Sequence, residues 1–234
     1  MNRRAVTITR RVSLGDVRPD ATMRLDAIAR LLQDVADADA ADAQVEGMGI
    51  WILRRLDLTI ARTPRFRADL TARTWCSGFG ARWAERRTDI YAGDLCCIEA
   101  TGLWVHVDAE RGVPAPLPPG FHAVWGRHAG NRRVSARLLH GPPAANAVSG
   151  EWPLRATDLD VVGHVNNAAY WAPVEQELAR RGRPRVRRAE IEFRAGLDDG
   201  DDIRLAVADT PDGFACWLCV GGDVRASMLV ASTP

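Results

Sequence analysis

The stretch from Asp158 to Trp171 places an acid, an imidazole and two carboxamides within a few residues of one another. Asp160 can act as a nucleophile or a general base, and His164 carries a ring that exchanges protons near neutral pH. Asn166 and Asn167 follow, and the residues after them have the apolar spacing of a helix. The first N–H groups of a helix are unpaired and partly positive, so they can polarise a carbonyl group. This combination suits attack on an acyl carbonyl.

Each of these residues also has a plainer interpretation. Asp160 can simply close an Asx turn, and His164 can hold the loop by packing or by a hydrogen bond. Asn166 and Asn167 are better suited to shaping the loop and capping the helix than to reacting. We expect their backbone N–H groups, rather than their side chains, to face a developing oxyanion. The residue pattern alone leaves the catalytic and the structural interpretations open.

Composition narrows the class of protein. The chain has 234 residues, of which 47% are hydrophobic and 26% charged, as in globular domains. A formal net charge of +1 gives no general field that would favour nucleic acid or an anionic membrane as a partner. All 31 basic residues are arginine, which excludes lysine chemistry. No stretch approaches the roughly 20 apolar residues of a membrane span, and no secretory signal is evident, so we expect a cytoplasmic protein.

The five cysteines do not predict a disulfide framework or a metal site. An odd number cannot pair completely, and reduced thiols fit a cytoplasmic setting. Cys216 and Cys219 have the Cys-x-x-Cys spacing, but they fall in an alternating segment, where residues three apart point to opposite faces. We therefore expect neither a metal nor an organic cofactor.

Hydrophobic periodicity divides the chain into two similar halves. In the first half, helical spacing predicts a long buried helix capped by Asp20 and continuing to Ala43. Alternation predicts strands at 6–14, 50–60, 66–75, 82–91 and 95–107. A proline- and glycine-rich stretch follows, with a short strand at 134–139. The second half repeats this order, with a helix at 168–181 and strands at 186–193, 203–208, 214–220 and 224–230.

Short links between successive strands favour antiparallel sheets, so we expect an α+β fold in which each sheet curls around one helix. We place an N-terminal domain at 1–118, a linker at 119–147 and a C-terminal domain at 148–234. The repeat is one of architecture, because the two halves share no obvious sequence.

The motif Asp158-Leu-Asp160-Val…His164-Val-Asn166-Asn167…Tyr170 resembles the signature of the acyl-ACP thioesterases, a family of hot-dog enzymes. The resemblance extends to the first half, through Trp51-Ile-Leu-Arg-Arg-Leu, Arg73-Thr-Trp75 and Leu103-Trp-Val-His-Val-Asp108. It implies a tandem, or double, hot-dog fold, in which two antiparallel sheets are each wrapped around a central helix. Such a pair already contains the interface that single hot-dog domains obtain by dimerising, so a monomeric pseudo-dimer and a homodimer are both possible.

The resemblance also implies a function. Members hydrolyse a fatty acyl group from acyl carrier protein, so we expect an acyl-ACP or acyl-CoA thioester as substrate and no cofactor. Asp160 would be the base or nucleophile and His164 its proton partner. The amides at Asn166 and Asn167 would stabilise the oxyanion, and the first domain would house the acyl chain.

The sequence departs from the family pattern at three polar positions. Val162 stands where the plant enzymes have an asparagine, and Gly196 and Leu197 stand where the family has a glutamate and a cysteine. These departures favour the simpler hot-dog scheme of one carboxylate and a helix N-terminus. Another acid could take the glutamate's place, with Glu175 as the first candidate and Glu190 and Glu192 as weaker ones.

Two other functions remain open at this point. A hot-dog dehydratase or hydratase would leave the thioester intact, and a binding protein that had lost turnover would hold acyl thioesters without releasing thiol. Six arginines between Arg180 and Arg188 could dock an acidic carrier or the phosphates of coenzyme A, or could form a solvated loop. Acyl chain length and the choice between carrier protein and coenzyme A are not encoded in any recognisable motif.

Overall fold

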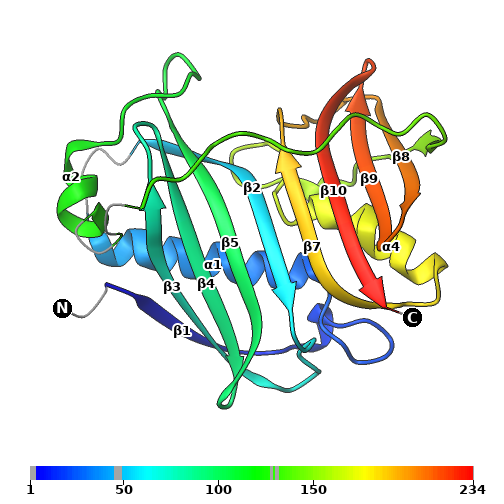
Figure 1. Cartoon of the computed structure of the whole chain (residues 1–234), viewed down its shortest axis with the longest axis horizontal. Coiled ribbons are helices and arrows are strands. Elements are labelled where there is room, and N and C mark those ends of the chain that lie inside the picture. The colour runs from blue at the N-terminus through cyan, green and yellow to red at the C-terminus, as the bar shows by residue number, and fades with distance from the viewer. Residues whose placement is uncertain (1–3, 45–48, 127–128, 130–131, 234) are drawn as a thin grey trace.

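The computed structural model describes residues 4–44, 49–126, 129 and 132–233. Within these residues, ten strands form a single antiparallel sheet in the order β1-β3-β4-β5-β2-β7-β10-β9-β8-β6 (Figure 1). The strands are β1 (Val6–Arg11), β2 (Ile50–Ile60), β3 (Asp69–Phe79), β4 (Trp83–Ala92), β5 (Leu95–Val107), β6 (Val148–Glu151), β7 (Arg185–Phe193), β8 (Ile203–Thr210), β9 (Gly213–Val220) and β10 (Asp223–Thr233).

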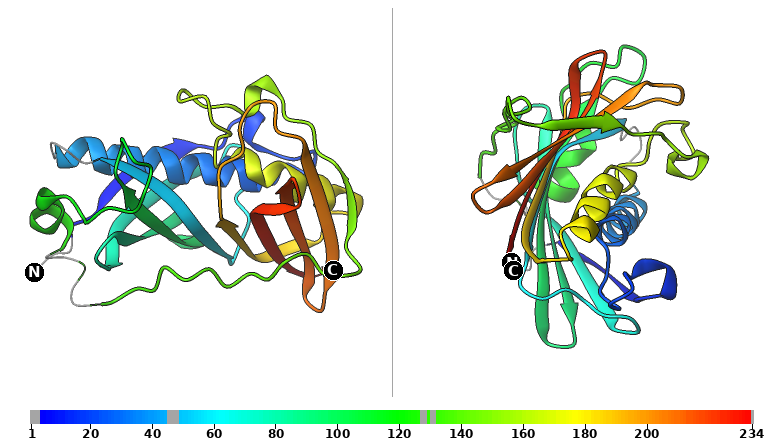
Figure 2. Two further views of the ribbon diagram at one scale, coloured as in Figure 1. Left: turned by 90° about the horizontal axis from the view of Figure 1, so that it is seen from above. Right: turned by 90° about the vertical axis from the view of Figure 1, so that its right-hand side faces the viewer.

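Two helices, α1 (Leu25–Ala43) and α4 (Ala172–Arg180), lie along the same face of this sheet, one for each half (Figure 2). The predicted α+β architecture is therefore present. The two halves meet where β2 pairs with β7, from Arg55 opposite Glu192 to Thr59 opposite Arg188. This pairing makes the two expected sheets continuous, so side chains from both halves share one hydrophobic core.

Helix α1 packs against the sheet through the predicted apolar stripe. Leu25, Ile28 and Val35 are at most 1% exposed. The prediction that Asp20 caps this helix is wrong, because Asp20 accepts hydrogen bonds from Thr22 in the preceding turn. The helix begins five residues later, and the N–H of Leu25 donates instead to Glu175 of the other half over 2.7 Å. The missing local cap is supplied from 150 residues away.

Helix α4 starts more gradually than the periodicity suggested. A 3-10 turn at Ala169–Trp171 precedes the α-helix, whose second residue is Pro173. Trp171, Val174 and Leu178 are buried and form the apolar side of this segment. The helix therefore directs its N-terminal end, and the loop before it, toward the junction of the two halves.

The connection between the halves runs across the face of the sheet that the helices leave uncovered (Figure 2). The predicted strand at 134–139 is wrong, since the backbone there pairs with side chains and not with a neighbouring strand. Trp83 Nε1 donates to the carbonyl of Val134 over 2.7 Å, and the fully buried carboxylate of Glu192 accepts from the N–H groups of Leu139 and His140 over 2.6 and 2.9 Å. These contacts give the segment its extended form without a ladder.

The Cys-x-x-Cys pair diverges as expected. Cys216 lies in the main core, whereas Cys219 packs with Trp217 in a separate cluster. Burial raises the pKa of Cys216 to about 12, so this thiol stays protonated at neutral pH. Among the described helices, none has the length and apolar character needed to cross a membrane.

Candidate active site

The predicted acid and imidazole face each other across the neck of a tight hairpin before α4. Leu159 and Val165 form a bridge, and the N–H of Asp160 donates to the carbonyl of His164 over 2.8 Å. The N–H of Gly163 returns to the carbonyl of Asp160 over 3.0 Å, and Gly163 has a φ of +82°. Glycine adopts this left-handed backbone conformation at little energetic cost. This explains why a glycine closes the turn in the sequence Asp-Val-Val-Gly-His. Facing residues of such a pair project their side chains from the same side.

Only one oxygen of the Asp160 carboxylate accepts a hydrogen bond from a described residue. Its Oδ1 accepts the N–H of Val162 over 3.0 Å, which is the Asx turn of the plainer interpretation. No described residue donates to Oδ2, so one oxygen remains available. Val161 and Val162, at the tip of the hairpin, are fully and 70% exposed, and the valine in place of the family's asparagine therefore points into solvent.

His164 is held by an acid that the sequence analysis did not single out. Its Nδ1 lies 2.7 Å from Oδ1 of Asp198, and both side chains are about two-thirds exposed, at 65% and 64%. Because a carboxylate can only accept, Nδ1 carries the proton in this pair, and Nε2 of the neutral ring keeps a lone pair. His164 can thus receive a proton at Nε2 while Asp198 fixes its orientation and stabilises the charged form.

The segment that carries Asp198 is attached to the catalytic hairpin at several points. Val165 donates to the carbonyl of Leu197 over 3.1 Å, and the N–H of Leu197 donates to the hydroxyl of Tyr170 over 2.9 Å. Burial raises the pKa of Tyr170 to about 12, so its hydroxyl remains neutral and serves as an acceptor. These bonds make Asp198 part of a defined arrangement, despite its exposure.

Asn166 and Asn167 have different surroundings. Asn166 shapes the loop: its N–H donates to the carbonyl of Asp158 and its Oδ1 accepts from Ala168, both over 2.8 Å. The N–H of Asn167 has no acceptor among the residues that the structure describes, and neither does its side-chain amide. Asn167 therefore keeps the free donor expected of an oxyanion site, whereas Asn166 does not.

Asn167 lies beside an apolar chamber of about 340 Å³ in the N-terminal half. Its lining includes the aromatic residues Trp51, Trp104, Phe121 and Trp125, together with Ala36 and Ala40 of α1. A narrow cavity of about 30 Å³ adjoins it, since Gln33, Arg86, Trp104 and Asn167 line both. The loop before α4 of one half thus meets an apolar chamber of the other.

The other acids proposed in place of the family's glutamate are all engaged elsewhere. Glu175 accepts hydrogen bonds from Nε and Nη2 of Arg18 over 2.7 and 2.6 Å, and a third from the N–H of Leu25. Glu192 anchors the connecting segment. Glu190 lies 3.8 Å from Nε2 of His140 and also pairs with Arg188, and these two neighbours lower the pKa of the Glu190 carboxyl. The acidic run Asp198–Asp202 was the sequence signal for the carboxylate that actually meets His164.

Comparison with known proteins gives matches over both halves of the chain. Residues 7–125 match the acyl-ACP thioesterase N-terminal domain and residues 143–221 match the C-terminal domain. An uncharacterized protein of Mycobacterium tuberculosis is 29% identical over 224 residues, which cover 94% of this chain and 89% of the relative.

Two solved structures align over nearly the whole chain. The 12:0-ACP thioesterase from Umbellularia californica has a TM-score of 0.84 at 17% identity, with coverage of 98% of this chain and 97% of that one. An acyl-ACP thioesterase from Bacteroides thetaiotaomicron has a TM-score of 0.82 at 18% identity, covering 97% of both chains. These alignments confirm the predicted double hot-dog fold. Because the two domain matches together span most of the sequence, the chain belongs to the acyl-ACP thioesterase family and is a thioester hydrolase.

Proposed function

We propose that this enzyme releases a fatty acid from acyl carrier protein, with Asp160 as the general base or nucleophile. The observation that carries the proposal is the position of Asn167, whose free N–H lies at the end of the catalytic hairpin and beside the apolar chamber. An acyl chain in that chamber would bring its thioester to the hairpin. The N-terminal half would then bind the acyl group and the C-terminal half would carry the reacting residues.

The residues support a simple sequence of proton transfers. Water adds to the carbonyl carbon as its proton passes to Asp160, and the N–H of Asn167 stabilises the oxyanion. The C–S bond then breaks, and the proton reaches the leaving sulfur through Nε2 of His164. Asp198 keeps the ring in the required tautomer. In the alternative route Asp160 attacks the carbonyl itself, and water hydrolyses the resulting anhydride.

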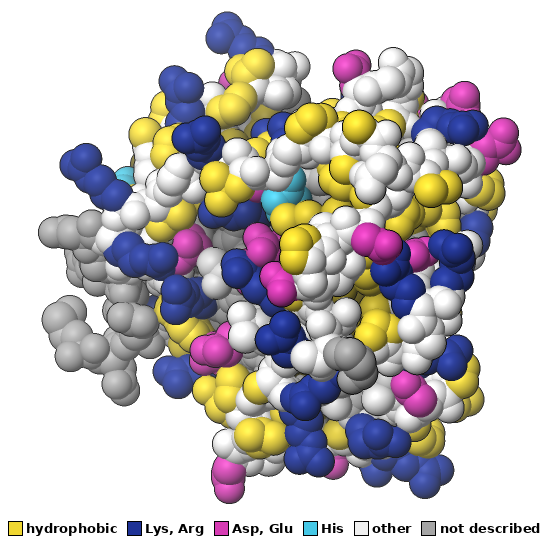
Figure 3. Space-filling view, turned by 45° about the vertical axis from the view of Figure 1, so that its right-hand side comes forward, with side chains coloured by type: hydrophobic (Ala, Val, Ile, Leu, Met, Phe, Trp, Pro, Cys, Tyr) yellow, Lys and Arg dark blue, Asp and Glu magenta, His cyan; other side chains and the backbone are white. Residues whose placement is uncertain are grey.

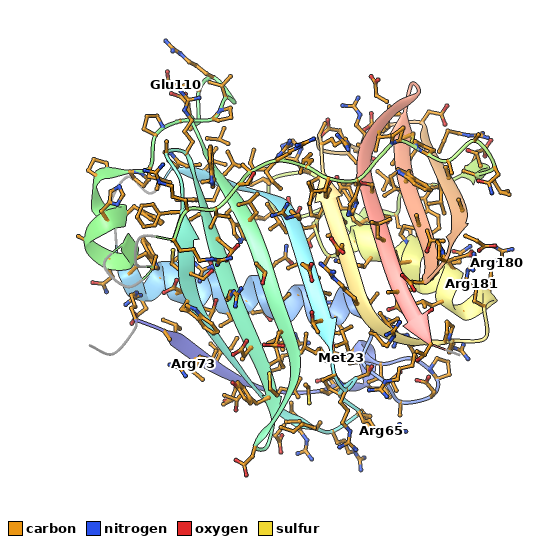
Figure 4. All side chains as sticks on the ribbon, viewed as in Figure 1. Met23, Arg65, Arg73, Glu110, Arg180 and Arg181 are labelled. Carbon is orange, nitrogen blue, oxygen red and sulfur yellow. The ribbon has the colours of Figure 1, made fainter. Side chains whose placement is uncertain are left out.

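The arginine-rich segment favours a carrier protein as the acyl donor. Arg180 and Arg181 form ion pairs with Glu177 at the end of α4, away from the catalytic hairpin (Figure 4). Arg183 and Arg187 are exposed and have no carboxylate partner among the described residues. Dark-blue side chains gather along the lower edge of the face shown in Figure 3. A basic surface at a distance from the reacting bond suits an acidic carrier.

Release of free thiol from acyl-ACP and acyl-CoA tests the proposal. We expect Asp160→Asn to lower turnover by about 10²–10⁴-fold while substrate binding persists. Asp198→Asn should lower turnover less, because His164 keeps its ring but loses its orienting partner. Equal rates for the parent and the Asp160 variant would remove that carboxylate from the chemistry. Absence of thiol release from the parent would favour a binding protein, and altered acyl products without thiol would favour a dehydratase or hydratase.

A further inference from the structure

Residues with unpaired hydrogen-bond donors line the narrow cavity between α1 and the start of α4. Among them are Asn167 with its backbone N–H, Gln33 with its side-chain amide and Trp171 with its indole N–H. None has an acceptor among the residues that the structure describes. Trp171 is fully buried, and its Nε1 is out of reach of solvent. An unpaired buried donor such as this indole is costly in a folded protein, and two further residues with free donors share its cavity, which suits an oxygen atom there.

Gln33 reaches this cavity from the half that carries no catalytic loop. It lies on the face of α1 that also presents Ala29 and Ala36, which line the cavities on either side of it. The remaining neighbours of Gln33 are largely apolar, including Leu53 and Leu56. A half-buried amide in such surroundings contributes nothing to the core. Its position is better explained by a polar group of the substrate.

Arg86 also lines both cavities, but its charge is already compensated. Its Nη1 donates to the buried carboxylate of Asp39 over 2.8 Å and lies 3.3 Å from the hydroxyl of Thr74. Trp125 donates to the same carboxylate over 2.8 Å. Arg86 is thus held by contacts within the N-terminal half. Gln33 is then the neutral side-chain amide that this half can offer to an oxyanion.

We propose that Gln33 is a further catalytic residue, whose carboxamide N–H donates to the thioester carbonyl oxygen opposite the N–H of Asn167. The oxyanion site would then span the two halves, with one donor from each and the indole of Trp171 beside them. This inference rests on the proposed hydrolysis. It gives the tandem arrangement a role, because Gln33 adds a donor from the N-terminal half to those that the C-terminal half presents.

Steady-state thiol release by Gln33→Ala gives the first test. Loss of one oxyanion donor should lower kcat by about 10²–10³-fold with little change in KM, because the bond strengthens as charge develops. Gln176→Ala makes the same chemical change on an exposed position of α4 and should leave kcat unaltered. A kcat equal to that of the parent would overturn the proposal, and so would a rise in KM alone.

A second measurement does not depend on turnover. A decanoyl-CoA analogue with a methylene in place of the sulfur, labelled with ¹³C at its ketone, reports hydrogen bonding through the carbonyl stretching band. We expect this band to move to higher frequency in Gln33→Ala than in the parent, while it stays in place in Gln176→Ala. An unchanged band overturns the assignment of Gln33 even if the enzyme hydrolyses thioesters normally. Absence of thiol release from the parent would count instead against the proposed function.

Discussion

Replacing Glu175 with alanine removes the carboxylate that joins the two halves around the start of α1. Glu175 accepts two hydrogen bonds from Arg18 and one from the N–H of Leu25, all between 2.6 and 2.7 Å. Both side chains of the ion pair are only 12% exposed. The substitution therefore leaves a largely buried guanidinium without its partner and an α-helix without its cap.

The expected effect is large. Breaking a buried ion pair by removing one partner costs about 3–5 kcal/mol, and loss of a helix cap costs about 1 kcal/mol. We take the lower end for the ion pair, about 3 kcal/mol, because the pair is not completely buried, and with the cap the total is about 4 kcal/mol. For a chain of this length each kcal/mol lowers Tm by about 2–4 °C, so Tm should fall by about 8–16 °C.

Thermal unfolding monitored by circular dichroism, together with thiol release well below the transition, separates the two roles of Glu175. We expect the alanine variant to lose stability and to retain turnover per folded molecule. Glu151→Ala is the matched control, since its side chain is 83% exposed and its nearest guanidinium lies 4.0 Å away; Tm should change by no more than about 1–2 °C. An unchanged Tm with a large loss of turnover would refute the structural role and restore Glu175 as a catalytic acid.

Two further predictions concern what the enzyme binds. Ala40→Phe should fill part of the chamber and shift the preference of the enzyme toward shorter acyl chains, by about fourfold in kcat/KM for each methylene excluded. Ala41→Phe, on the exposed side of the same helix, is the control and should leave the chain-length preference unchanged. An unchanged chain-length profile in Ala40→Phe would place the acyl group elsewhere. Charge reversal at Arg183 and Arg187 should raise KM for acyl-ACP, while KM for acyl-CoA changes little. Arg73→Glu, on β3 at the opposite end of the molecule (Figure 4), is the control, and equal effects on both substrates would contradict carrier docking there.

Local sequence patterns were sufficient for most of the secondary structure. The predicted bounds of β2 and β5 agree with the structure to the residue, because Gly49 precedes the first strand and Asp94 and Asp108 flank the second. The helix at 25–43 is equally plain, since its apolar stripe has helical spacing throughout. Such elements carry their own signals and need no partner to be recognised.

The features that sequence reasoning missed depend on residues far apart in the chain. The segment at 134–139 has strand-like residues, but its partners are the side chains of Trp83 and Glu192. The cap of α1 comes from Glu175, and the partner of His164 lies 34 residues away. No local pattern encodes these pairings, because each joins segments that meet only in the folded chain.

The family motif located the hairpin before α4 but could not show what each of its residues contacts. Asp160 and His164 face each other across that hairpin and Asn167 lines the cavities at the junction of the halves, whereas Asn166 is used in the loop itself. Whether these residues react remains a prediction for the thiol-release assays. The chamber and the donor at Gln33 have no motif at all, since their lining residues are scattered over α1 and four strands.

The position of Asp198 has a physical explanation that the lost glutamate makes clear. His164 forms a bridge with Asp198, and side chains two residues apart in an extended segment point to the same face. A carboxylate at 198 therefore projects from the same face as one at 196, the position of the family's glutamate. A Cβ atom at Gly196 would meet no other atom within 4 Å, so packing does not force glycine there. A carboxylate thus meets the imidazole two residues beyond the position at which the family has its glutamate.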